Sequence, residues 1–455
     1  MLTIGTWLNA LGRQLTECPI WPPDIYAIAG ALLKRSGAYL RVFEHDGRSH
    51  YLDDVTQIGA GWRARLDAME QPITVAKLRA ARPEQLERAW KALDKFHATP
   101  IGKIRESSAV AERLIRMALI ADEACVGIGI DQQHESDDGS ESPGTFLTLA
   151  DWMLRSHDAR SFCWEISADA ICVLGKQHTP ARGATFRSLS HHLSLHLPND
   201  IEARWVNVLQ HPSERNHRRD TLSLLLLPWP TQIETSDFHS VPGASASSNL
   251  GSHGSYFRFE PAKPTTPKSF GQLLARAIKL GCKNAGQIDA IVLPESALTR
   301  AQYRVAERIA IGHRAILITG VREASSKRRH DQNRCVFQPA GFLREASHNN
   351  PRARRLAEEL RLEQPKHHRW CLDREQLISY QLAGTLPIRQ SAWENIEIPE
   401  RTLYFVTMNQ MTWSVLICED LARQDPAADL IRAVGPPNAA APFCVPRANA
   451  RKPVV

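Results

Sequence analysis

The sequence predicts an α/β protein whose helix-rich α+β N-terminal region precedes a C-terminal region of alternating strands and helices. Two short apolar runs, Leu222–Leu227 and Ile288–Leu293, are typical of buried strands. Between them, the apolar residues of Phe270–Leu280 recur at helical spacing. The chain of 455 residues is long enough for two or three domains with cores of their own.

The composition is that of an ordinary globular protein, with 43% apolar and 23% charged residues. The longest strongly apolar run, Leu222–Leu227, is too short to cross a bilayer, so we expect no membrane insertion. Met1–Gln14 lacks the pattern of a secretory signal. The nine cysteines are scattered and form no Cys-x-x-Cys pair, which favours reduced thiols in the cytoplasm over disulfides or a zinc ribbon.

The net charge of +7 is mild for this length. Much of it sits in short basic runs, Lys327–His330 and Arg352–Arg355. Such runs are more often solvated loops and helix faces than nucleic-acid contacts. Nucleic-acid binding therefore remains the less favoured alternative, and it would appear as a salt-dependent affinity.

Residues 1–130 are predicted to be mainly helical, with helices over Pro83–Phe96 and Ala109–Ala121. Two apolar stretches flanking an Asp46-Gly47 turn predict one hairpin over Ala38–Leu52. The sequence Tyr51-Leu52-Asp53-Asp54 matches the Tyr-x-Asp-Asp of reverse transcriptases. We interpret it as the end of a hairpin strand, because the 50 residues before it are too few for the rest of such a site.

An acidic, polar segment over residues 131–144 is predicted to be a linker. Residues 145–215 then read as a mixed α/β region, with a helix over Thr148–Ser156 and a strand over Ala170–Leu174. Within it lie three histidines, His191, His192 and His196. A metal site needs a carboxylate or further ligand at suitable spacing, and none stands out nearby, so surface or packing histidines are favoured.

Residues 220–434 form the region that carries candidate chemistry. Its Ser- and Gly-rich stretch Ser240–Gly254 is predicted to be a long loop. Glu295 directly follows a predicted strand that ends at Pro294, where α/β proteins place functional groups. Cys418 follows a β-branched run and precedes the predicted helix Pro426–Val434, and a helix N-terminus stabilises a thiolate.

Three segments in the order Glu, Lys, Cys resemble the nitrilase, or carbon–nitrogen hydrolase, superfamily. These segments are Leu293-Pro294-Glu295-Ser296, Lys366-His367-His368 and Ile417-Cys418-Glu419-Asp420. Three further features also match: Leu222–Leu227 as a first strand, Ala315–Gly320 as a strand ending in glycine, and Asn333. The resemblance covers only the C-terminal half of the chain.

The resemblance implies a hydrolase that cleaves non-peptide carbon–nitrogen bonds of a small amide or nitrile. Cys418 would attack the carbon and form a thioester, Glu295 would act as general base, and Lys366 would stabilise the oxyanion. Many relatives have another Glu shortly after the Lys, and Glu375, with Asp373 behind it, is the nearest candidate. The resemblance also implies a four-layer αββα sandwich that often pairs into dimers, with no metal or organic cofactor. Such domains also occur fused to other modules in bacterial antiviral systems.

The C-terminal end departs from the family pattern. Only 37 residues follow Cys418, and residues 435–455 contain five prolines and no strand or helix pattern. We therefore expect an aberrant tail from a truncated or frameshifted reading frame, in which case hydrolysis by this chain is in doubt. The alternatives are a short variant completed by a partner chain, or a nitrilase-like binding or sensing module without activity.

Overall fold

The computed structural model describes most of the chain. The described residues are 2–14, 16–43, 54–129, 144–156, 159–177, 185–197, 201–208, 222–247, 253–324, 330–339, 351–388, 391–399, 401–408, 411–423, 426–435 and 438–440. Most of the predicted linker, of the Tyr-x-Asp-Asp segment and of the first basic run therefore lies outside them. Within the described part, no helix combines the length and apolarity that a membrane span requires.

The described part of the chain contains both helices and sheets, as predicted for an α/β protein, and it forms two compact units. The first contains residues 1–207, 403–414 and 425–438, and the second contains residues 208–402, 415–424 and 439–455. Both units are therefore assembled from segments that are distant in the sequence.

The first unit is built on helices. They are α1 Ile4–Ala10, α2 Pro22–Ser36, α3 Val55–Asp67, α4 Val75–Ala81, α5 Glu84–Leu93, α6 Ser108–Glu123, α7 Thr145–Ser156, α8 Phe186–Leu189 and α14 Ala427–Val434. Helix α2 starts with two prolines in its first turn, ends at Gly37 with φ 69°, and is buried over most of its length against α6. The predicted helices over 83–96 and 109–121 are confirmed.

The predicted hairpin is wrong over its first half. Ala38–Phe43 forms a 3₁₀ helix directly after the left-handed Gly37, and the predicted turn lies outside the described residues. An alternating apolar pattern over six residues is compatible with either structure when the segment packs on neighbouring helices. Here Arg41 donates to the carbonyl of Arg105 at 2.8 Å and to the hydroxyl of Ser108, the first residue of α6, at 2.6 Å, which fixes the 3₁₀ segment beside α6.

Two small sheets belong mainly to the first unit. β1 Cys172–Gly175 pairs antiparallel with β2 Leu193–His196, which confirms the strand predicted near residue 172. The other sheet has the order β16-β15-β14-β3, from Asn438–Ala440, Met411–Val415, Thr402–Met408 and Glu202–Asn207. The ring of Trp205 stacks on that of Phe405 with centroids 5.6 Å apart. The prediction that the tail forms no strand is therefore wrong for β16.

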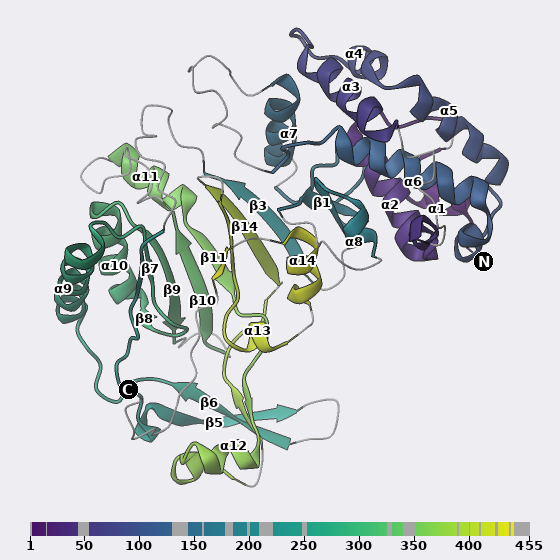
Figure 1. Ribbon diagram of the computed structural model, residues 1–455. Helices are drawn as coiled ribbons and strands as arrows, with labels where there is room; N and C mark the ends of the chain where they lie inside the picture. Colours follow the sequence, from purple (N-terminus) through teal and green to yellow (C-terminus); the bar gives the residue numbers. More distant parts are fainter. Residues whose placement is uncertain are drawn as a thin grey trace. The chain divides into compact units, whose positions relative to one another are not determined.

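The main sheet of the second unit has the order β11-β10-β9-β7-β4. These strands are Leu362–Pro365, Gln332–Gln338, Ile316–Glu323, Ala290–Val292 and Leu224–Leu226, and the short β8 Leu298–Thr299 also pairs with β9. Strands β4, β7 and β9 are parallel, β10 pairs antiparallel with β9, and β11 pairs antiparallel with β10. Helices α9 Pro267–Ala285 and α10 Arg300–Gly312 lie side by side against this sheet (Figure 1) and share one apolar core with it.

The first predicted strand of this region lies at an edge rather than at the centre. Within the described residues β4 pairs only with β7, and the side chains of Leu224 and Leu226 are 45% and 67% exposed. Leu225, which points the opposite way, packs on the apolar core. The expectation that both faces of this strand are covered is therefore wrong for β4, whereas β7 is an interior strand.

A second sheet of the same unit has the order β12-β13-β6-β5, from Cys371–Leu372, Ala392–Glu394, His253–Phe259 and Phe238–Ser247. Its β5–β6 hairpin occupies most of the Ser- and Gly-rich stretch predicted to be a loop. That prediction is wrong, because backbone pairing with β6 supplies the order that the small side chains cannot. The remaining helices are α11 Pro351–Leu360, α12 Arg374–Ser379 and α13 Glu419–Ala422.

Candidate active site

Glu295 lies where the chain leaves β7 and passes close to Gly320 of β9. The backbone N–H of Gly320 donates to the carbonyl of Pro294 at 3.1 Å. A Cβ on Gly320 would lie 2.4 Å from the backbone N of Ser296 and 2.5 Å from the Cα of Glu295. Only glycine allows this approach. Arg322 donates to the backbone carbonyls of Ser296 and Ala297 and fixes the turn from the other side.

Lys366 follows β11 and lies fully inside the protein, with 1% of its side chain exposed. Its backbone N–H donates to the carbonyl of Asn333 on β10 at 3.0 Å. Its Nζ is 2.8 Å from Oε1 of Glu295 and 2.6 Å from Oε2 of Glu394. A buried ammonium is tolerated only where carboxylates compensate its desolvation, and here two of them do so.

Glu394, at the end of β13, was not predicted from the sequence. Its carboxylate accepts from Nδ2 of Asn333 at 2.9 Å and from the backbone N–H of Trp370 at 3.1 Å. The same Nδ2 donates to Oε1 of Glu295 at 2.7 Å. Asn333, singled out by the resemblance, thus joins both carboxylates to one amide. Glu394 stands 28 residues after Lys366, and the pairing of β13 with β12 and with β6 brings it back to the lysine.

Glu375, the predicted additional carboxylate, lies elsewhere. It occupies the first turn of α12, where its side chain is exposed. Asp373 is the N-cap of the same helix and accepts from the backbone N–H of Gln376 at 2.8 Å. The position beside Lys366 is taken by Glu394 instead.

Burial and charge act in opposite directions in this cluster. Burial raises the pKa of Glu295 above its ordinary value, although the charge of Lys366 acts to lower it. Burial alone would lower the pKa of Lys366, but the carboxylates of Glu295 and Glu394 outweigh it and hold that pKa well above the ordinary value. The lysine therefore stays charged, and a proton is more readily held by the Glu295 carboxyl than it would be in water.

Cys418 lies at a sharp turn between β15 and the single-turn helix α13. Its backbone has φ 46° and ψ −101°, a conformation that L-residues rarely adopt. Strain of this kind costs about 1–3 kcal/mol and is concentrated at functional sites. The helix predicted to start at Pro426 is α14, one element later, so the dipole beside Cys418 is that of only four residues, Glu419–Ala422.

Hydrogen bonds join the segment that carries Lys366 to the one that carries Cys418. Nε2 of Gln364 donates to the carbonyl of Val415 at 2.8 Å. On the other side, the backbone N–H of His367 donates to the buried carboxylate of Asp420 at 3.0 and 3.1 Å. These contacts fix the residues on either side of Lys366 to those on either side of Cys418. The two functional groups are thus carried by adjoining segments.

Asp420 also fixes the second histidine of the lysine segment. Nδ1 of His368 lies 3.0 Å from Oδ1 of Asp420. Nε2 of His367 lies 2.9 Å from the carbonyl of Thr402, and burial lowers the pKa of this ring below its ordinary value. His367 is therefore neutral and donates from Nε2. Its ring holds the lysine segment in position and contributes no charge to the site.

A surface pocket opens beside the Glu295–Lys366–Glu394 cluster. Asn333, Glu394 and Ser296 reach its wall, together with the aromatic rings of Phe257 and Phe259. Its lining is therefore partly apolar and partly polar, as in small-molecule sites.

Comparisons with known proteins add little information on function to the geometry of the site. No family model matches the sequence, and no curated protein matches it. Among solved structures, the chain is weakly similar to a CN-hydrolase superfamily protein from Xanthomonas campestris, whose crystal structure has an arsenic adduct in the active site. The TM-score is 0.25 at 14% identity, and the match covers 40% of this chain. It spans 62% of the length of that protein.

Proposed function

We propose that the second unit is a carbon–nitrogen hydrolase in which Cys418 is the nucleophile and Glu295, Lys366 and Glu394 assist it. The observation that carries the proposal is the fully buried Lys366, whose Nζ lies 2.6 and 2.8 Å from two carboxylates. Burying three charged groups is costly for folding, which makes a catalytic use the better explanation of their presence. The same proposal includes three expectations from the sequence. They are the four-layer αββα arrangement, the domain limits and the formation of dimers.

In this mechanism the Cys418 sulfur attacks the carbonyl carbon of an amide, and its proton passes to the Glu295 carboxylate. The carbonyl oxygen becomes an oxyanion, which the charged Lys366 stabilises. The carbon–nitrogen bond then breaks as Glu295 returns the proton to the leaving amine. Water attacks the resulting thioester and gives a proton to Glu295. The carbon–sulfur bond then breaks, Glu295 returns that proton to the Cys418 sulfur, and the carboxylic acid leaves.

Glu394 has a positioning role in this proposal. It holds the Lys366 ammonium at 2.6 Å while Asn333 bridges both carboxylates. With Glu394 ionised, the lysine charge remains compensated when Glu295 takes up a proton. Because two carboxylates are present, Glu295 can become neutral while the buried ammonium of Lys366 keeps a negatively charged neighbour.

The test is hydrolysis by the full chain, measured as ammonia release from a panel of small aliphatic and aromatic primary amides and nitriles. Hydroxylamine added during turnover should divert the thioester to a hydroxamate, which a free hydrolytic reaction would not form. Cys418→Ala and Glu295→Gln should each abolish both signals. Cys371→Ala is the matched control, because Cys371 is also partly exposed, lies in the same unit, and has a pKa raised by burial.

Activity that survives Cys418→Ala would overturn the proposal. So would hydroxamate formation that Cys371→Ala abolishes as completely as Cys418→Ala. A cooperatively melting chain that neither turns over any member of the panel nor forms an adduct at Cys418 with them would favour a binding module on the same fold.

A further inference from the structure

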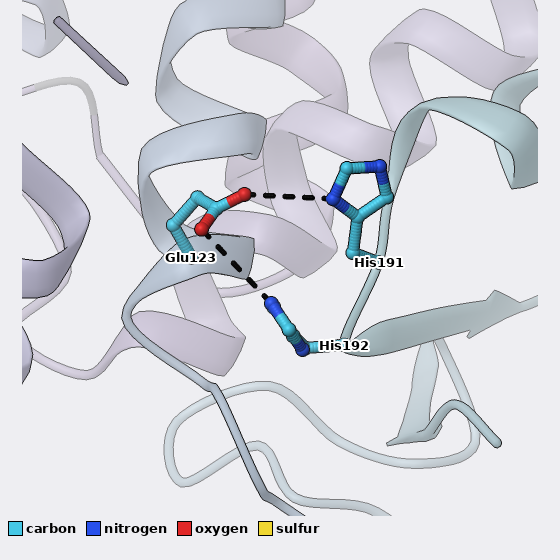
Figure 2. Close-up of side chains that lie close together, drawn as sticks. All are labelled: Glu123, His191 and His192. Atoms are coloured by element: carbon cyan, nitrogen blue, oxygen red, sulfur yellow. Dashed lines mark ion pairs between the residues drawn. The ribbon is translucent and has the colours of Figure 1, made fainter. Parts of the chain in front are cut away.

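The two adjacent histidines that the sequence left without a partner meet a carboxylate in the fold. Glu123 ends helix α6, and His191 and His192 come directly before strand β2. Nδ1 of His191 is 3.6 Å from Oε1 of Glu123, and Nε2 of His192 is 4.0 Å from Oε2. Figure 2 shows the two imidazole rings turned toward different oxygens of the same carboxylate. His196, the third histidine of the segment, lies buried within β2 and does not join them.

The residue before Glu123 fixes both histidines. The buried carboxylate of Asp122 accepts from the backbone N–H of His191 at 2.5 Å, of His192 at 3.1 Å and of Leu193 at 2.7 Å. One turn of α6 therefore positions the histidine backbone and supplies the third side chain. Outer groups that orient ligands in this way accompany protein metal sites.

Glu123 itself is held by close packing. A Cβ on Gly59 of helix α3 would lie 2.4 Å from Cβ of Glu123 and 2.9 Å from the carbonyl of Ile120. The two helices can approach this closely only because position 59 is glycine. The carboxylate is therefore presented from a rigid helix pair rather than from a loop.

The distances suit a metal ion better than direct hydrogen bonds. Separations of 3.6 and 4.0 Å exceed the usual range for N–H···O bonds. Around zinc, nitrogen and oxygen ligands at about 2.0–2.2 Å stand roughly 3.3–3.5 Å apart in tetrahedral geometry. The three candidate ligand atoms lie within 4.8 Å of one another, so side-chain shifts of about 1 Å bring them to that geometry.

The ligand atoms and their exposure narrow the kind of ion. Mg²⁺ and Ca²⁺ prefer oxygen ligands, whereas this cluster offers two imidazole nitrogens and one carboxylate. Imidazole nitrogen favours zinc and its neighbours. The side chains of His191, His192 and Glu123 are 57%, 24% and 18% exposed, which leaves the site open to solvent.

We propose that Glu123, His191 and His192 bind a zinc ion, with a fourth coordination position open to water or to an exogenous ligand. All three residues belong to the first unit, whereas Cys418 belongs to the second. It links the end of α6 to the start of β2, so zinc binding should also stabilise this unit against unfolding.

The experiment uses the full chain after treatment with EDTA. Zn²⁺ binding is measured by calorimetry, and Co²⁺ is titrated as a spectroscopic probe of the ligand atoms. We expect one site whose cobalt spectrum lacks a thiolate charge-transfer band, because the ligands are nitrogen and oxygen. Losing an orienting group costs about 10–100-fold in metal affinity, so His191→Ala, His192→Ala and Glu123→Gln should each weaken binding at least as much.

His313→Ala is the matched control, because it removes another exposed histidine and should leave affinity unchanged. His191 is more than half exposed, so its replacement should leave the apo-protein melting temperature unaltered, which separates loss of a ligand from misfolding. Zn²⁺ affinity unchanged in all three variants would overturn the proposal. A cobalt spectrum dominated by thiolate bands would also overturn it, as would an affinity for Mg²⁺ equal to that for Zn²⁺.

Discussion

Replacing Lys366 with Met should destabilise the protein in a pH-dependent way. The substitution keeps an unbranched side chain of similar length but removes the cation between Glu295 and Glu394, whose side chains are only 8% and 13% exposed. Removing one partner from a buried charge cluster costs about 3–5 kcal/mol, because the remaining charges stay desolvated. We expect a loss of that size at pH 8.

The loss should shrink as the pH falls. Without the lysine, the folded-state pKa of the Glu295 carboxyl, which burial already raises, rises further above the unfolded value, so the folded variant binds protons more tightly than the unfolded chain does. That contribution is complete below the unfolded pKa and disappears as the pH rises through the folded pKa. The variant should therefore recover part of its deficit between pH 8 and pH 5.

Urea denaturation of Lys366→Met and the parent protein at both pH values measures the two free energies of unfolding. The exposed lysine of α9, in Lys283→Met, provides the control for a lost surface charge and should change stability by less than about 0.5 kcal/mol. A Lys366→Met deficit below about 1 kcal/mol, equal at pH 8 and pH 5, would refute the charge-compensation reasoning.

Three further substitutions test the site's construction. Gly320→Ala should destabilise by about 1–3 kcal/mol in urea denaturation, because its Cβ would meet the backbone N of Ser296 at 2.4 Å; a neutral effect would contradict the close approach. Cys418→Gly should be more stable than Cys418→Ala by about 1 kcal/mol in the same assay, because only glycine adopts φ 46° without strain; the reverse order would exclude a strained turn. Asp420→Ala should cost about 1–3 kcal/mol, because the buried N–H of His367 loses its acceptor; unchanged stability would contradict that role.

The elements that could be predicted from the sequence are those set by local patterns. The apolar run Ile288–Leu293 contains β7 because its side chains face α9 and α10 on one side of the sheet. Glu295 could be located because a proline ends that run. Asn333 and Lys366 could be located because they occupy the order of residues that the resembled family shows. The structure brings Glu295, Lys366 and Asn333 into one hydrogen-bonded cluster.

The missed residues are those that tertiary structure alone brings into place. Glu394 reaches Lys366 through the pairing of β13 with β12 and β6, and Glu123 reaches His192 across 68 residues of intervening sequence. No spacing rule links such pairs. The β5–β6 hairpin was missed for a related reason, since its Ser- and Gly-rich strand gains order from backbone bonds to β6 rather than from its own side chains.

The central claim, that Cys418 is an activated nucleophile, is tested most directly by the rate at which iodoacetamide alkylates each cysteine, followed by mass spectrometry of the full chain's peptides. Cys418 should react fastest of the nine cysteines, and Glu295→Gln should slow its alkylation while leaving that of the partly exposed Cys282 unchanged. Alkylation of Cys418 no faster than that of Cys282, with no response to Glu295→Gln, would contradict the account.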